Sequence, residues 1–261
     1  MRMLTRLLCV FAVLVSVAFA ESLDETRKKA ESAEKIELRK KAEAGHVESQ
    51  VELAVDYRYG INANLVESAR WWRAAAEQGH LSAQWNLAEY LRQGRGIAKN
   101  IYEAIEWYTK AAEGGHFLSQ YDLGQLFWMG IEISRDRQLA FKWISAAAAQ
   151  GSAEAQNRLG QFYFDGFGVP KDMVEAIKWY TKAAEQNHLL SQAILGEVYL
   201  AGEGVVAKNL VEAHVWFNLA TAAGLDQSAE RSTAEKQMTR EQIAEATKLA
   251  KERFERYGNK K

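Results

Sequence analysis

The sequence predicts an all-α protein built from repeated helix pairs. A segment of 36 residues, 152–187, recurs along the chain, so that Leu159 has its counterpart 72 residues earlier at Leu87. Each copy holds two stretches with apolar residues at helical spacing, separated by a glycine-containing turn. The single proline, Pro170, lies in one of these turns and interrupts no helical stretch. We therefore expect one array of stacked, antiparallel helix pairs.

Residues 1–20 precede the repeats and have the organisation of a cleaved secretory signal peptide. Arg2 and Arg6 supply the positive start, an apolar stretch follows, and residues 18–20 (AFA) form a small-x-small cleavage motif. The apolar stretch is short for a membrane span, and an uncleaved anchor is the alternative. Cys9 lies early in that stretch, whereas a lipoprotein cysteine would end it. We expect an exported protein, periplasmic or secreted, without an integral membrane segment after cleavage.

Composition restricts what the exported chain can do. Cys9 is the only cysteine, so residues 21–261 can form no disulfide. Of the 33 basic residues, Arg2 and Arg6 leave with the signal peptide, so 31 remain against 34 acidic residues and the net charge becomes about −3. A chain with this balance is not built to bind a polyanion, and we expect no nucleic-acid partner.

In chain order, residues 21–45 form an N-terminal capping helix with a thin apolar stripe that ends at Gly45. Residues 225–261 form C-terminal capping helices, the last of which begins with a capping box, Thr239 with Gln242. Its apolar side carries Ile243, Ala246, Leu249, Ala250 and Phe254. Five repeat units lie between these caps, at residues 46–79, 80–115, 116–151, 152–187 and 188–224.

Each unit has a first helix, helix A, and a second helix, helix B. Helix A places apolar or small residues on one buried face, and a small residue at its ninth place, such as Gly160, lets a neighbouring helix approach closely. Helix B begins with a capping box, for example Asp172 with Glu175. In that motif the cap accepts a bond from the N3 amide, and the glutamate bonds back to the cap's N–H. The third unit keeps the cap, Asp136, but has Leu139 in place of the glutamate.

Helix B also carries aromatic residues at one recurrent place. Because they recur in each unit and each can bury on the order of 150–250 Å², we expect them to form the core between helices. They are Trp71/Trp72, Trp107/Tyr108, Trp143, Trp179/Tyr180 and Trp216/Phe217.

The repeat motif, L-G-x-x-Y-x-x-G-x-G-V-x-[KR]-D followed by A-x-x-W-Y-x-K-A-A-E-x-G, resembles the Sel-1-like repeat, a relative of the tetratricopeptide repeat. In the fourth unit Leu159, Gly160, Tyr163, Trp179 and Ala183 are among the residues that carry it, and the resemblance extends over residues 46–224. It implies a right-handed α-solenoid that acts as an exported, non-catalytic scaffold or adaptor for a protein or peptide partner.

Two other functions remain open. One is a periplasmic regulator that binds and restrains a membrane sensor protein. The other is a penicillin-binding or β-lactamase-like activity, as in cysteine-rich relatives of the family that the chain resembles. This chain lacks the cysteines that those relatives use in each repeat.

Histidines recur at the first place of four units, which raises the question of a metal site. They are His46, His80, His116 and His188. Successive units stack about 10 Å apart, whereas zinc ligands must each reach within about 2.1 Å of one ion. We expect these histidines to start helices, and His214 to be a packed histidine. The sequence also lacks a nucleophile elbow and a phosphate-binding glycine loop, so we predict no catalytic residue, metal or cofactor.

Positions that differ between units are the candidates for a binding surface, because packing alone would make every unit alike. By resemblance to the tetratricopeptide helix, these positions of helix A lie on the concave surface, where exposed aromatics and amides suit an extended peptide or a partner helix. The alternative is that Trp128 and Phe164 pack against helix A of the neighbouring unit. The predicted partner-binding residues are Trp85, Glu89, Arg92, Tyr121, Gln125, Trp128, Met129, Asn157, Gln161, Phe164 and Asp165.

Overall fold

A computed structural model describes residues 34–60, 63–202 and 207–258. The predicted signal peptide and residues 21–33 of the predicted capping helix lie outside these described residues, whereas residues 34–43 are helical as expected. The described residues form helices and contain no strand, which confirms the predicted all-α class.

The predicted units each form two helices joined by a turn. The first helices of the pairs are α2 (Val47–Tyr59), α4 (Leu81–Gln93), α6 (Phe117–Met129), α8 (Ala153–Asp165) and α10 (Leu189–Ala201). The second helices are α3 (Leu65–Glu77), α5 (Ile101–Glu113), α7 (Arg137–Ala149), α9 (Met173–Ala184) and α11 (Leu210–Ala222). Two further helices follow, α12 (Ser228–Glu235) and α13 (Arg240–Gly258).

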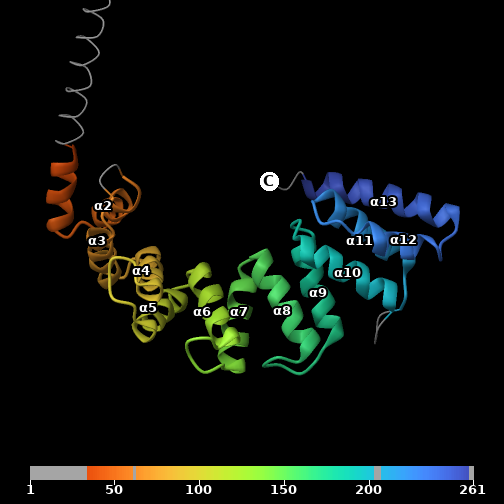
Figure 1. Ribbon diagram of the computed structural model, residues 1–261, viewed down its shortest axis with the longest axis horizontal. Coiled ribbons are helices and arrows are strands. Elements are labelled where there is room, and N and C mark those ends of the chain that lie inside the picture. Colours follow the sequence, from red (N-terminus) through yellow and green to blue (C-terminus); the bar gives the residue numbers. More distant parts are fainter. Residues whose placement is uncertain (1–33, 61–62, 203–206, 259–261) are drawn as a thin grey trace, which may run out of the picture. The chain divides into compact units, whose positions relative to one another are not determined.

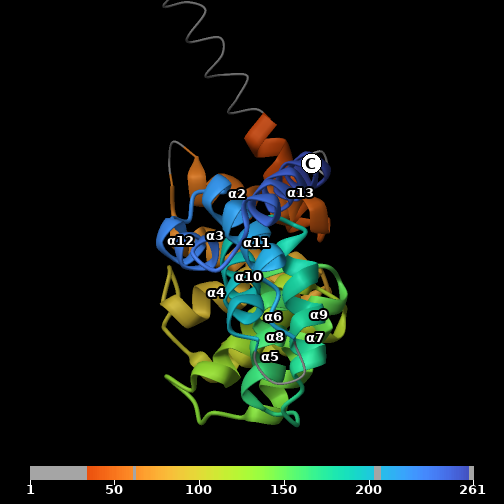
Figure 2. The same cartoon turned by 90° about the vertical axis from the view of Figure 1, so that its right-hand side faces the viewer.

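The chain divides into two compact units, Met1–Ala104 and Ile105–Lys261, which are described separately. In the first, α3 packs against both α2 and α4. In the second, α6 to α11 pack in sequence, each helix against the next (Figure 1). The terminal helix α13, in blue, lies along α11 in both views (Figures 1 and 2). No helix among the described residues is long and apolar enough to cross a membrane.

The recurrent histidines start helices, as predicted. His188 is the N-cap of α10, and its Nδ1 accepts a hydrogen bond from the backbone N–H of Ser191 at 3.2 Å. His46, His80 and His116 cap their helices in the same way. The fourth unit uses Ser152, whose hydroxyl oxygen accepts from the N–H three residues on. The recurrence therefore reflects helix capping.

The helix B caps differ from the prediction in one respect. Asp172 accepts from the backbone N–H of Glu175 at 3.0 Å, as a capping box requires. Its own N–H, however, donates to the carbonyl of Tyr163 on α8 at 2.9 Å, so the predicted bond from the glutamate is wrong. Asn64 and Asn209 likewise donate to a carbonyl of the preceding helix. That carbonyl fulfils the role assigned to the glutamate, which explains why the third unit does without one. By contrast, the capping box of α13 forms in both directions.

Small residues on helix A let helix B cross closely. At Gly160 an added Cβ would stand 2.8 Å from the Tyr180 ring, and at Gly196 it would stand 2.4 Å from the Phe217 ring. Both separations are below any ordinary contact of a side-chain carbon, so the aromatic rings occupy the space that a larger residue would need. This confirms the predicted role of the small residue at the ninth place of helix A.

The recurrent aromatic residues of helix B are buried, as predicted, apart from Trp179, which is half-buried. In the second compact unit, Val215, Trp216 and Leu219 of α11 form a cluster with Ala246 and Ala250 of α13. The prediction was wrong for Phe254, which is 50% exposed. Tyr257, three residues further along α13, is 5% exposed and belongs to the cluster instead.

A ladder of glutamines, in which a buried side chain pairs with an exposed one, joins consecutive helices. Gln156 donates from its side chain to the carbonyl of Ala148 at 3.3 Å, and it accepts at Oε1 from the side chain of Gln186 at 2.8 Å. Gln186 also donates to the carbonyl of Gly151 at 3.0 Å. The same arrangement recurs one unit earlier at Gln120 and Gln150. The amides of Gln156 and Gln186 thus supply further donors to carbonyls at the end of α7, of which that of Ala148 also accepts the N–H of Gly151.

Candidate functional site

The clearest candidate site is a pocket of about 720 Å³ over α8 and α10, the helix A segments of the fourth and fifth repeats. Its floor and walls are mostly apolar, with a few polar side chains, as is usual for sites that bind ligands. The lining residues are Asn157, Arg158, Gln161, Phe164, Asp165, Tyr180, Leu190, Ala193, Ile194, Glu197, Val198, Ala201, Leu225 and Gln227.

Four of the predicted partner-binding residues line this pocket: Asn157, Gln161, Phe164 and Asp165. Asn157 donates from its side-chain amide to the hydroxyl oxygen of Ser191 at 2.8 Å, which ties α8 to α10. Phe164 is half-buried and packs at the edge of the core cluster, so it both supports the fold and presents part of its ring to the pocket. Asp165 is exposed at the end of α8.

Sequence reasoning missed the α10 side of the pocket. Leu190, Ala193, Glu197 and Ala201 stand 36 residues after Glu154, Asn157, Gln161 and Asp165, at the same places of the next unit. The repeat period alone would have found them. Leu225 and Gln227 follow α11 outside the repeat pattern, and the sequence carries no comparable signal for them.

Tyr180 reaches this pocket from helix B. Its ring passes over Gly160 of α8, where no side chain blocks it, and the residue is 3% exposed yet lines the pocket. Among the described residues its hydroxyl has no hydrogen-bond partner. Burial, and next the charge of Asp165, raise the pKa of Tyr180 well above its ordinary value of 10.0. The hydroxyl therefore stays neutral and can both donate and accept a hydrogen bond.

Arg158 contributes the one guanidinium to the pocket lining, and this guanidinium is already engaged. It lies 3.9 Å from the ring centre of Trp128 and donates to the side-chain oxygen of Gln161 at 2.6 Å. Glu197 lies at the rim, and its pKa is raised by partial burial and then by the nearby charge of Glu230. These two acidic groups repel each other, so the site favours a positive charge in this area.

The predicted residues of α6 do not line this pocket. Tyr121 and Trp128 are half-buried and pack against a core cluster of α7 and α8, as the alternative for Trp128 anticipated. Gln125 donates to the Tyr121 hydroxyl oxygen at 3.0 Å, and Met129 is 40% exposed. Burial raises the pKa of Tyr121.

Three predicted residues belong to α4, in the other compact unit. Arg92 and Glu89 form an ion pair at 2.9 Å along the helix, and Trp85 is half-buried. The two carboxylate oxygens of Glu89 accept from Nε and a terminal nitrogen of Arg92, so the pair is bidentate. This pairing leaves their charges largely compensated.

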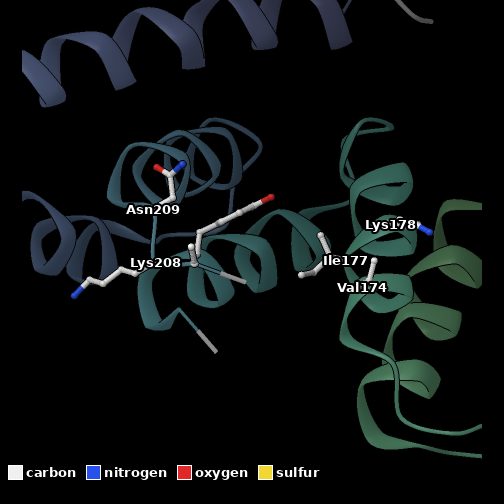
Figure 3. A pocket seen from close by; sticks show the side chains of 7 residues that line it. Val174, Ile177, Lys178, Lys208 and Asn209 are labelled. Atoms are coloured by element: carbon white, nitrogen blue, oxygen red, sulfur yellow. The ribbon is translucent and has the colours of Figure 1, made fainter. Parts of the chain in front are cut away.

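A second pocket of about 460 Å³ lies between α9 and the segment before α11. Figure 3 shows Val174 and Ile177 of α9 on one side and Asn209 on the other. The side chains of Lys178 and Lys208 extend away from the space between them (Figure 3). Lys178 pairs with Glu175 and Lys208 donates to Gln237, which accounts for these directions.

The described part of the chain contains no group of three or more histidine, cysteine, aspartate or glutamate side chains placed to hold a metal ion.

A sequence profile of the Sel1 repeat matches residues 47–80, 81–116, 118–152, 153–188 and 189–225. The chain belongs to the Sel1 repeat family. The pocket over α8 and α10 therefore lies on the fourth and fifth Sel1 repeats of the chain.

Solved structures agree with this assignment. A Sel1 repeat protein from Oxalobacter formigenes is 28% identical, with a TM-score of 0.68 over 84% of this chain and 98% of that one. The protective antigen c5321 of uropathogenic Escherichia coli, which displays an SLR fold, is 31% identical, with a TM-score of 0.53. That match covers 85% of this chain and 56% of the antigen. These likenesses confirm the predicted all-α solenoid of Sel1 repeats, whereas a search of curated proteins found no match.

Proposed function

We propose that this Sel1 repeat protein is an exported, non-catalytic scaffold that binds a peptide segment of a partner protein in the pocket over α8 and α10. The observation that carries the proposal is the pocket itself, in which predicted, non-repeating residues of α8 meet their counterparts on α10. Sel1 repeat proteins are typically scaffolds for protein interaction, which supports this class of function.

The proposal of export rests on the sequence of residues 1–20. We expect the protein isolated from its host to begin at Glu21 and to fractionate outside the cytoplasm. Intact-mass measurement of the purified protein checks the first expectation. A mature chain that retains Met1 would contradict signal cleavage and would favour the uncleaved anchor.

Leu190 provides a direct test of partner binding. It lines the pocket, is 57% exposed, and stands at the second position of α10. A photocrosslinking amino acid at this position should capture a partner in intact cells of the host. Mass spectrometry of the crosslinked product identifies that partner, and a membrane sensor among the products would support the regulatory alternative.

Val174 is the matched control for this experiment. It stands at the second position of α9, is 48% exposed, and lines the other pocket. Glutamine removes the apolar surface without adding charge and is compatible with either helix. We therefore expect Leu190→Gln to weaken partner capture and Val174→Gln to preserve it, with unchanged helical circular dichroism in both variants. Crosslinking at position 174 alone would contradict the proposal.

A further inference from the structure

Three side chains that line the pocket over α8 and α10 carry acceptors with no donor among the described residues, namely two exposed carboxylates and one buried amide oxygen. Among the described residues, Asp165 and Glu197 form no ion pair and accept no hydrogen bond. The side-chain oxygen Oε1 of Gln227, which also lines the pocket, is buried and has no partner. A buried acceptor without a donor destabilises the folded state, because it has given up its hydrogen bond to water. A ligand that brings donors would remove this destabilisation.

The Tyr180 hydroxyl is a fourth polar group at the pocket, and its availability is established independently of the three acceptors. Tyr180 is 3% exposed, lines the pocket, and has no hydrogen-bond partner among the described residues. At the corresponding place of the next unit, Phe217 packs on Gly196 without a hydroxyl. Packing therefore does not require the hydroxyl, which leaves it available to a ligand.

The carboxylates at and near the pocket favour a cation. Helix α8 contributes Asp165 and the engaged Arg158, α10 contributes Glu197, and α12 contributes Glu230, which acts on Glu197. Two further bases lie outside the lining: Lys171, whose ammonium is 5.1 Å from the ring centre of Phe164, and Arg231 of α12, which pairs with Glu235. The ring of Phe164 thus already attracts an ammonium group, as aromatic faces do.

The apolar lining suits the stem of a long basic side chain. Phe164, Leu190 and Ile194 supply apolar surface beside the carboxylates. Lysine and arginine bury their methylene groups along such surfaces and keep the charged head among acceptors. The pocket of about 720 Å³ also has room for an apolar neighbour of that residue.

We propose that the pocket receives a lysine or arginine side chain from the partner's segment, flanked by apolar residues, with Asp165, Glu197 and the Tyr180 hydroxyl around its charged head. This inference rests on the proposed function and specifies the chemistry of the partner. It is distinct from general attraction to the acidic chain, because it depends on three named groups in one pocket.

To test this inference, dodecapeptides that bind the purified protein are selected from a random phage-displayed library. We expect the selected peptides to be enriched in lysine or arginine next to apolar residues. Replacing that basic residue by norleucine, which keeps the stem and removes the charge, should weaken binding at least tenfold in fluorescence anisotropy. Enrichment of acidic or purely apolar peptides would overturn the inference.

The protein variants locate the effect. Asp165→Asn with Glu197→Gln should weaken the selected peptide at least tenfold, and Tyr180→Phe should weaken it severalfold while the ring still packs on Gly160. Glu106→Gln with Glu255→Gln removes two charges at exposed positions outside the pocket and should change affinity less than twofold. Equal losses in the two double variants would show general electrostatic attraction and overturn the inference.

The outcome also separates this inference from the proposed function. If peptides bind and Leu190→Gln weakens their binding, but the carboxylate variants do not weaken it, the pocket is a peptide site without a basic anchor. A selection that yields no binding peptide, or peptides indifferent to Leu190→Gln, contradicts the proposed function as well.

Discussion

At the scale of single residues, the helix caps connect stability to pH. The Nδ1 atom of His188 caps α10 by accepting from Ser191, which only the neutral imidazole can do. Burial lowers the pKa of His188 below its ordinary value of 6.5, against a smaller opposing effect of Glu154. A folded-state pKa below the unfolded one means that the neutral form stabilises the fold. That stability is fully present above about pH 6.5 and is lost as the pH falls through the lowered pKa.

We therefore expect His188→Ser to be close to neutral at pH 7.5 and to reduce the loss of stability on acidification. Serine is a suitable replacement because Ser152 caps α8 at the same place. The free energy of unfolding from urea titrations at pH 7.5 and pH 5 should fall by roughly 1 kcal/mol less in the variant than in the wild type. An identical decrease in both proteins would assign the pH dependence to other groups.

The residue scale also shows where sequence reasoning ends. Resemblance to the tetratricopeptide helix and the lack of repetition selected Asn157, Gln161, Phe164 and Asp165, which line the pocket. Extending the same positions by one period of 36 residues would have supplied Glu197. No periodic signal shows that an aromatic residue of helix B reaches through helix A. Tyr180 and Phe217 occupy the same place of the repeat and differ only in the hydroxyl. Whether that hydroxyl has a hydrogen-bond partner depends on three-dimensional contacts that the linear pattern does not contain.

At the scale of helices, the glutamine ladder explains part of the stacking, and it is incomplete after α10. Gln192 is fully buried and donates to the carbonyl of Ala184 at 3.1 Å, but its Oε1 has no partner among the described residues. The residue that would complete the ladder is Ala223, where the preceding units have Gln150 and Gln186. The backbone of Ala223 (φ −84°, ψ −3°) nearly equals that of Gln150 (φ −82°, ψ 1°).

Because the backbone is already suitable, we expect Ala223→Gln to stabilise the protein by roughly 0.5–1.5 kcal/mol, the net value of a hydrogen bond. Thermal melting and urea unfolding measure the change. Ala222→Gln is the control, since it introduces the same side chain at an exposed position one residue earlier. A gain of the same size in the control would point to helix propensity and not to the ladder.

The helix scale was the most predictable from sequence. Apolar spacing and turn glycines predicted all five helix pairs, because the same local pattern is repeated with little variation. The predicted glutamate bond to the cap N–H was wrong because a carbonyl of the preceding helix competes for that N–H. Phe254 was assigned to the buried side of α13 by spacing, yet Tyr257 lies closer to the cluster on α11. Both errors concern tertiary contacts.

At the scale of the whole molecule, the end of an array of repeats needs a cover, because the last helix pair has no following unit to bury its apolar face. Helix α13 provides this cover over α11. Arg253 fixes its position through two hydrogen bonds of 2.7 and 2.8 Å to the carboxylate of Glu212. Such a bidentate pair fixes direction as well as distance.

We expect Ala246→Glu to detach α13, since the residue is fully buried in the cluster and a carboxylate there would have no partner. Stability should fall by at least about 2 kcal/mol, and size-exclusion chromatography with light scattering should detect self-association through the uncovered apolar face. Ala244→Glu, at an exposed position of the same helix, should leave both properties unchanged. A monomeric Ala246→Glu variant with full amide protection in α13 would contradict this role.

The crossing at Gly160 has a further consequence for how binding in this protein can be mapped and can evolve. Because Tyr180 contacts the pocket from beneath α8, a mutational scan limited to solvent-exposed positions would pass over it. Conversely, a change of one buried residue on helix B, such as Ile144, Tyr180 or Phe217 in successive units, can alter which ligand a repeat accepts while its exposed helix keeps its sequence. In the binding mode that we propose, ligand preference therefore depends on buried residues of helix B as well as on exposed residues of helix A.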